Sequence, residues 1–124
     1  MNKITAAITA VGGYVPEGLL TNQDLEMMVD TNDEWITSRT GIKERRILKG
    51  EGKGTSFMAI KAAQQLIEKK NLDPKEIELV LVATATPDMQ AAATAAFVAS
   101  EIGAINAFGF DLEAACSSFL YGMS

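Results

Sequence analysis

Hydrophobic and polar residues recur with two different periods along the chain, and these periods predict alternating strands and helices. In residues 3–14, β-branched residues alternate with small ones before a Gly-Gly pair, a pattern typical of a strand that runs into a loop. Short Val/Leu- or Phe-containing runs within residues 72–88 and 105–114 indicate strands buried on both faces. Such strands are typical of a parallel sheet.

Four segments carry helix signals. Residues 21–30 and 31–41 each begin with a threonine that is followed three residues later by an acidic residue, which predicts two short helices with Thr21 and Thr31 as N-caps. Residues 55–71 form the clearest amphipathic helix, and residues 94–103 form a helix of small residues that ends at a glycine. The apolar face of the third helix carries Phe57, Ile60, Ala63 and Ile67.

The order of strand, helix, strand, helix and strand predicts an α/β fold with a mostly parallel sheet and helices packed on it. With 124 residues, of which 48% are hydrophobic, the chain is long enough for one domain with a core. A further helix is expected to begin near the cysteine that follows the last strand. One flexible loop is predicted, between Lys49 and Gly54.

Composition excludes several classes of function. A net charge of −5 argues against binding nucleic acid without sequence preference. No apolar run approaches the roughly 20 residues of a membrane span, and no signal peptide is recognisable, so we expect a cytoplasmic protein without a membrane partner. Histidine, the commonest metal ligand and general base, is absent, and we predict no metal site.

The single cysteine, Cys116, is the candidate nucleophile. It follows the last predicted strand and precedes a segment in which Phe119, Leu120 and Met123 have the spacing of a buried helical face. A cysteine at the N-terminus of a helix favours the thiolate, and nearby amide groups can stabilise an oxyanion. Its small neighbours leave room for a substrate: Ala114, Ala115, Ser117 and Ser118. Position alone also fits an inert, buried cysteine.

A second candidate site lies in residues 31–41. If this segment is helical, Thr31, Trp35 and Arg39 recur every four residues and share one face, which suits an adenine nucleotide. The alternative is a tryptophan in the core and a solvated arginine. The basic residues that follow, within 43–49, form either a solvated face or a surface that attracts phosphates.

Two blocks carry a family resemblance. The sequence DTNDEWITSRTGIKERRI, followed downstream by FDLEAACSSFLYG, resembles β-ketoacyl-acyl carrier protein synthase III of the thiolase-like superfamily, and LVATATPD lies where this family has its strand and loop before the acyl pocket. The resemblance covers essentially the whole chain. It implies an acyltransferase that starts type II fatty acid synthesis. In that reaction an acyl-CoA primer acylates Cys116, and malonyl-acyl carrier protein then loses CO2 and attacks the thioester.

The resemblance also implies roles for the second candidate site. Trp35 would stack on the adenine of CoA, while Arg39 and Thr31 would contact the nucleotide. The CoA thioester is a substrate, so no cofactor is expected, and the partners would be acyl-CoA, malonyl-acyl carrier protein and a second copy in a homodimer. The chain departs from the family pattern at Ala91 and Ala92, where the family often has Phe-Pro, and at Ser118, where it often has glycine. The first departure argues against a strict preference for acetyl and leaves room for a longer or branched primer.

The family completes its site with a histidine and an asparagine from a second half. We therefore expect residues 1-124 to be an N-terminal thiolase-like half-domain, with the C-terminal half absent, and to acylate itself at best weakly. Two alternatives stay open. The chain could come from a related condensing enzyme that makes polyketide or alkylquinolone starters, or it could be a non-catalytic interaction module.

Overall fold

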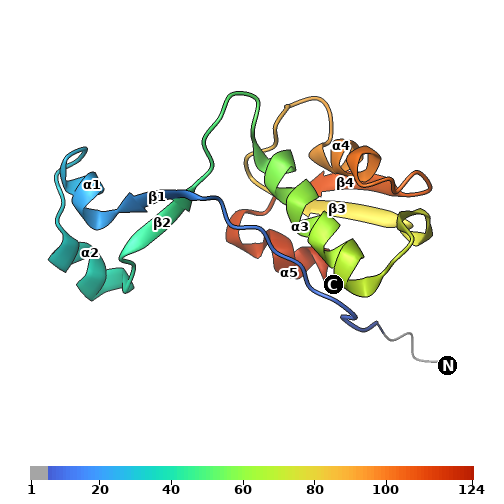
Figure 1. The fold of residues 1–124 in the computed structure, drawn as a ribbon, viewed down its shortest axis with the longest axis horizontal. Helices are drawn as coiled ribbons and strands as arrows, with labels where there is room; N and C mark the ends of the chain where they lie inside the picture. The colour runs from blue at the N-terminus through green and yellow to red at the C-terminus, as the bar shows by residue number, and fades with distance from the viewer. Residues whose placement is uncertain (1–5) are drawn as a thin grey trace. The chain divides into compact units, whose positions relative to one another are not determined.

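The computed structural model describes residues 6–124, which form two compact units. Of the described residues, the larger unit comprises 6–14 and Gly54–Ser124, and the smaller unit comprises Val15–Lys53. Figure 1 shows the elements of both units along the chain. The half-domain over residues 1-124 stays a prediction. Within residues 6–124, no helix is both long enough and apolar enough to cross a membrane.

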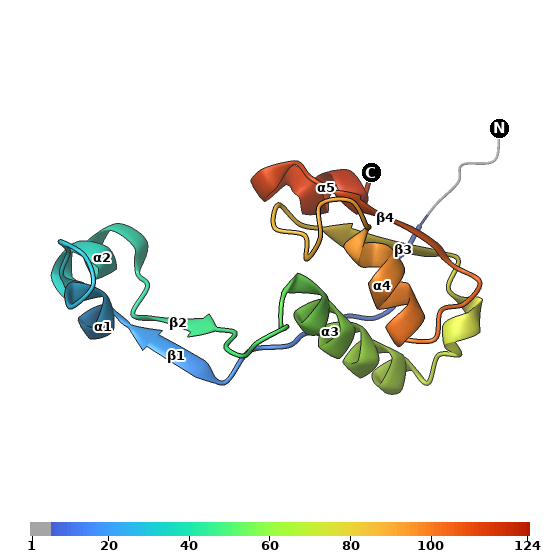
Figure 2. The ribbon, with the colours of Figure 1, turned by 90° about the horizontal axis from the view of Figure 1, so that it is seen from above.

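The larger unit is built on a parallel pair of strands, as the sequence predicts. Strands β3 (Leu79–Ala83) and β4 (Phe108–Leu112) pair in parallel, with Leu79 opposite Phe108. Helices pack on the pair, with α4 on one side and α5 on the other (Figure 2). The helical segments of this unit are α3 (Thr55–Lys70), η1 (Pro74–Glu76), α4 (Thr94–Glu101), η2 (Ala115–Ser117) and α5 (Ser118–Gly122).

Small side chains let α4 approach the strands closely. A Cβ added at Gly109 of β4 would lie 3.2 Å from the Ala95 Cβ and 2.9 Å from the Val80 carbonyl oxygen, so β4 has no room for a side chain there. The predicted apolar face of α3 is confirmed for Ile60, Ala63 and Ile67, which pack against the core. The buried core consists of Val82, Ala95, Val98, Ala99, Ile102 and Ala104.

A carboxylate on β4 caps α4. The residue at the N-cap, Ala93, has no side chain that could accept a hydrogen bond. Instead Asp111 accepts the backbone N–H groups of Thr94 at 2.7 Å and Ala95 at 2.8 Å. A negative charge at a helix N-terminus is favourable because of the helix dipole and the unpaired amides. Asp111 therefore ties the second strand to the helix that covers it.

The smaller unit combines two short helices with an antiparallel strand pair. Strand β1 (Gly18–Thr21) pairs with β2 (Glu44–Ile47), which the charged pattern of the sequence did not indicate. The predicted helices are confirmed as α1 (Asn22–Glu26) and α2 (Asp33–Thr40).

The predicted N-cap at Thr21 is confirmed, because it forms a capping box with Asp24. The predicted N-cap at Thr31 is wrong: Asn32 caps α2, since its side chain accepts the Trp35 N–H at 2.7 Å.

The strand predicted over residues 3–14 is not present in its described part. Residues 3–5 lie outside the described residues, and residues 6–14 form no strand. They run along α3 instead: the Gly13 N–H donates to Gln65 Oε1 at 3.0 Å, and Tyr14 makes an edge-to-face contact with Phe57 at 5.8 Å. The alternating pattern is that of a strand, but a strand also needs a ladder partner, and none is found within residues 6–124.

The capping box makes the stability of the smaller unit depend on pH. Hydrogen bonds from the Thr21 backbone N–H and hydroxyl to Asp24 hold the pKa of this carboxyl below its ordinary value. The resulting stability is fully present above the pKa of the unfolded chain, about 4, and is lost as the pH falls through the folded-state pKa. We expect Asp24→Asn to unfold with a weaker pH dependence between about pH 5 and 2 than the original chain. Urea titrations at several pH values in this range measure the free energy of unfolding. An equal dependence of this free energy on pH in both chains would contradict the prediction.

Candidate functional site

Cys116 lies at the turn between β4 and α5, as predicted. Strand β4 ends at Leu112, a single turn of 3-10 helix covers Ala115–Ser117, and α5 begins at Ser118. The cysteine is exposed, so the alternative of an inert, buried thiol does not hold in this structure. Ala115 adopts a left-handed conformation with φ of 46°, which is uncommon for a residue with a side chain. The turn thus presents the thiol at the carboxyl end of β4.

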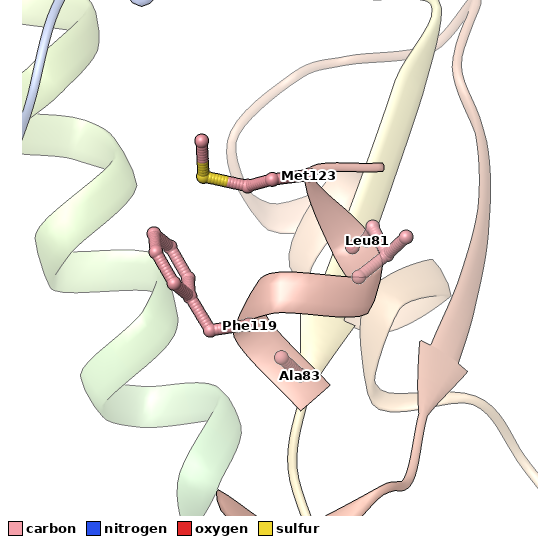
Figure 3. Close-up of a pocket in the computed structure, with 5 residues that line it drawn as sticks. Leu81, Ala83, Phe119 and Met123 are labelled. Atoms are coloured by element: carbon pink, nitrogen blue, oxygen red, sulfur yellow. The ribbon is translucent and has the colours of Figure 1, made fainter. Parts of the chain in front are cut away.

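The predicted buried face of α5 is wrong in this structure. Phe119 is 67% exposed, Leu120 70% and Met123 55%. Within residues 6–124 the helix contacts β3 and the adjoining turn η2, and the exposed side chains show that much of its circumference remains uncovered. Figure 3 shows Phe119 of α5 and Met123, which directly follows α5, beside Leu81 and Ala83 of β3. These four residues line an apolar hollow of about 150 Å³.

A larger hollow of about 320 Å³ lies at the carboxyl ends of the two parallel strands. It is bounded by the end of β3, by the end of β4 and by the loop between β3 and α4, and it is lined by Thr84, Pro87, Met89, Gln90, Ala91, Ala92, Ala93, Asp111 and Glu113. Ligands of α/β sheets bind preferentially at the carboxyl ends of strands. Cys116 follows β4 at this same edge, three residues after Glu113.

The loop around this hollow is held at both ends by side-chain hydrogen bonds. Asp88 accepts the Ser56 N–H at the start of α3 at 3.2 Å, and its own N–H donates to Thr94 Oγ1 at 3.4 Å. Near the start of the loop, Thr86 accepts a hydrogen bond from the Thr55 hydroxyl through its carbonyl oxygen at 2.7 Å. These bonds tie the loop to both helices, while Ala91 and Ala92 add only methyl groups to its wall.

Trp35 and Arg39 lie on one face of α2, as their spacing predicts. The guanidinium carbon of Arg39 lies 4.9 Å from the centre of the Trp35 ring, within the range of a cation–π contact. Trp35 is 53% exposed, so it is not the core residue of the alternative interpretation. Both side chains are therefore available to a ligand in the smaller unit.

Thr31 does not share the helical face of these two residues. Helix α2 begins only at Asp33, because Asn32 takes the N-cap position, and Thr31 precedes the cap. Thr31 nevertheless lines a surface hollow of about 230 Å³ together with Trp35, Asp30 and Asn32. The prediction of a shared helical face is wrong for Thr31, but the structure brings it next to the tryptophan.

A buried asparagine, which no sequence pattern predicted, fixes the other side of α2. Asn22 is 0% exposed, and its Nδ2 donates to Asp33 Oδ1 at 2.6 Å and to the Ile42 carbonyl at 2.9 Å. Its Oδ1 accepts from Arg45 Nη1 at 2.5 Å. Asn22 thus joins α1, α2 and β2, and Arg45, which the sequence placed in a basic surface run, is part of an internal network. Neither hydrophobic period nor motif marks a single buried asparagine.

Comparison with solved structures defines the class of fold. The chain superposes on 3-oxoacyl-[acyl-carrier-protein] synthase III from Aquifex aeolicus VF5 with a TM-score of 0.86 and 46% identity, over 92% of this chain and 36% of that one. It superposes on the priming β-ketosynthase of the R1128 polyketide pathway with the same TM-score and 37% identity, over 92% and 34% of the two chains. The fold is therefore thiolase-like, as the resemblance implied.

Sequence comparison gives the particular relatives. No family model matches the chain. It is 56% identical over 123 residues to β-ketoacyl-[acyl-carrier-protein] synthase III of Porphyromonas gingivalis W83, over 99% of this chain and 37% of that protein. The chain thus spans little more than a third of the curated relatives it matches. It matches the N-terminal part of β-ketoacyl-acyl carrier protein synthase III, and the predicted resemblance is confirmed to that extent.

Proposed function

We propose that the chain supplies the acyl-accepting part of a β-ketoacyl-acyl carrier protein synthase III, which joins an acyl-CoA primer to malonyl-acyl carrier protein at the start of type II fatty acid synthesis. One observation carries the proposal: the chain is 56% identical to such a synthase over 99% of its own length, a length that includes the exposed cysteine turn. The activity, substrates and partners are those expected of the longer protein.

In the first step, the Cys116 thiolate attacks the carbonyl carbon of the acyl-CoA thioester. The C–S bond to CoA breaks, the CoA thiolate leaves and takes up a proton, and the acyl group remains on Cys116 as a thioester. In the second step, malonyl-acyl carrier protein loses CO2, and the resulting carbanion attacks the acyl carbon and releases Cys116. The resemblance assigns the groups that stabilise this carbanion, a histidine and an asparagine, to a second half.

The hollow beside Trp35 is the proposed site for the nucleotide end of CoA. An exposed indole offers a flat surface for adenine, and the Arg39 guanidinium contributes a positive charge suited to phosphate. Thr31 lines the same hollow and offers a hydroxyl. The CoA thioester is a substrate in this proposal, and no cofactor is required.

Trp35 is the only tryptophan, so its fluorescence reports on this site directly. We expect CoA to quench the fluorescence in a saturable manner, because adenine would stack on the ring. We expect Arg39→Gln to weaken CoA binding by about tenfold, since an anion would lose a charged partner. An exposed lysine of the larger unit provides the control: Lys70→Gln is expected to bind CoA as the original chain does. An unchanged spectrum at millimolar CoA would contradict the site.

The lining of the hollow at the carboxyl ends of β3 and β4 supports the proposal of a primer longer than acetyl. Ala91 and Ala92 line it with methyl groups, and the family often carries bulkier residues at these two positions. A longer or branched acyl chain therefore has more space here than it would have beside bulkier residues. This space lies at the carboxyl ends of β3 and β4, and Cys116 follows β4. The preference for such a primer remains part of the proposal.

Intact-protein mass spectrometry tests the function directly. The chain is incubated with acetyl-CoA and, separately, with a longer acyl-CoA, and the adduct is mapped by peptide digestion. One acyl group on Cys116 is expected, formed faster from the longer primer. A protein that never acquires an adduct would favour the alternative in which the chain is a non-catalytic interaction module.

A related condensing enzyme is the second candidate function, favoured by the TM-score of 0.86 against the priming ketosynthase of a polyketide pathway. Both candidates share the acyl-cysteine step and differ in the carrier protein and the fate of the product. Condensation assays with fatty acid and polyketide carrier proteins would separate them. The homodimer, the cytoplasmic location and the absence of a nucleic acid partner also belong to the proposal.

A further inference from the structure

A buried serine hydroxyl bridges the two residues that precede Cys116. Ser118 is 3% exposed, and its Oγ accepts the Ala114 N–H at 2.7 Å and donates to the Ala115 carbonyl at 3.0 Å. The donor and the acceptor lie at opposite ends of the Ala114–Ala115 segment, so a single hydroxyl fixes both ends. The hydrogen bond from the Ser117 N–H to the Ala114 carbonyl, at 3.0 Å, closes the same turn through the backbone.

The bridged segment contains the strained residue of the turn. Ala115 has a φ of 46°, and a left-handed conformation is unfavourable for a residue with a side chain. Such a conformation persists only where its surroundings enforce it. The Ser118 hydroxyl meets this need, because a more extended Ala115 would move its carbonyl away from the hydroxyl that also holds Ala114.

The conformation of Ala115 determines how Cys116 is presented. The peptide between the two residues sets the direction of the Cys116 N–H and, with the next torsion, the direction of its side chain. We propose that Ser118 is a positioning residue that holds this turn so that the Cys116 thiol meets an acyl thioester in a reactive orientation; the inference rests on the proposed acyl transfer to Cys116. Misalignment of a reacting group by a fraction of an ångström lowers the rate at bound substrate rather than the affinity.

Removing the hydroxyl tests this role. We expect Ser118→Ala to acylate from saturating acetyl-CoA about tenfold more slowly, with KM unchanged within twofold. The matched control is Ser117→Ala, which removes an exposed hydroxyl from the residue directly after the cysteine and keeps its backbone hydrogen bond. It is expected to react as the original chain does. Circular dichroism melts confirm that the compared samples are folded.

A second readout does not depend on CoA. The rate of Cys116 alkylation by iodoacetamide is measured at one fixed pH, and we expect it to fall in Ser118→Ala but not in Ser117→Ala, because the turn that presents the exposed thiol would no longer be fixed. If both variants acylate and alkylate alike, the positioning role is wrong. If the original chain forms no acyl adduct while the alkylation rates of the two variants still differ, the proposed function fails and the positioning of the thiol stands.

A double variant keeps the test decisive should Ser118→Ala fail to fold. Ala115→Gly removes the cost of the left-handed conformation, because glycine adopts positive φ freely. Combined with Ser118→Ala, it is expected to restore folding but not the rate, since glycine permits the turn without fixing it. A double variant that acylates at the original rate would overturn the proposal.

Discussion

Cys116→Ser is expected to abolish the acyl adduct while the chain remains folded. Serine differs from cysteine by one atom, and the side chain at this turn is exposed, so packing should not change. A serine hydroxyl is un-ionised at neutral pH, and the described site includes no histidine to activate it, because the sequence has none. The expected loss in acylation rate is about 10³-fold or more, in line with the removal of a covalent nucleophile.

The measurement is the time course of adduct formation with acetyl-CoA, followed by intact mass. Met123→Leu provides a control for general disturbance of the segment, since it alters an exposed side chain of similar size that follows α5. It is expected to form the adduct at a rate close to that of the original chain. Labelling of Cys116→Ser by acyl-CoA at that same rate would show that the acyl group resides elsewhere, and Cys116 would lose its assigned role.

The elements that carry strong periodic signals could be predicted from the sequence. The helix at Thr55–Lys70 repeats its apolar residues over four turns, β3 is an uninterrupted apolar run, and β4 is apolar except for Asp111. The cysteine turn followed from their order, because a strand that precedes a helical pattern leaves only a short connection. The shared face of Trp35 and Arg39 could be predicted from their spacing alone, since both residues lie inside α2.

The features that were missed depend on partners distant in the sequence. Strand β2 consists of charged residues, and only its pairing with β1 makes it a strand. Residues 6–14 have the opposite problem, a strand-like pattern without a paired strand in the described part of the chain. Thr31 was misplaced by a single position, because Asn32 competes for the same cap and its side chain reaches the Trp35 N–H. Local propensity does not decide between two adjacent capping residues.

The exposed face of α5 is a different kind of miss. Its apolar spacing marks side chains for which burial is favourable, since Phe119 and Leu120 would gain from removal from water. Burial also requires a second surface, and within residues 6–124 only the strand side of α5 is covered. Periodicity therefore identifies which side chains favour burial, but it does not show whether the same chain supplies the covering element.

Asn22→Ala is expected to have the largest effect on the smaller unit, both on its folding and on CoA binding. The substitution removes the donors to Asp33 and to the Ile42 carbonyl and leaves the Arg45 guanidinium without its 2.5 Å acceptor. Each buried polar group left without a partner costs about 1–3 kcal/mol, so a total near 3 kcal/mol is expected. A unit as small as Val15–Lys53 has little stability in reserve.

Hydrogen exchange followed by mass spectrometry measures this loss unit by unit. Amides of Val15–Lys53 are expected to lose protection in Asn22→Ala, while those of Gly54–Ser124 keep it. The quenching of Trp35 by CoA should weaken in parallel, because α2 loses the bonds that hold its inner side.

Thr37→Val is the matched control: it removes a hydroxyl that lies 3.3 Å from Asn22 Nδ2 and 3.2 Å from Asp33 Oδ1 and keeps the stronger bonds. It should cost less than about 1 kcal/mol. The prediction is wrong if the amides of the smaller unit are as protected from hydrogen exchange in Asn22→Ala as in Thr37→Val and if both variants bind CoA equally well. The buried network would then not position α2.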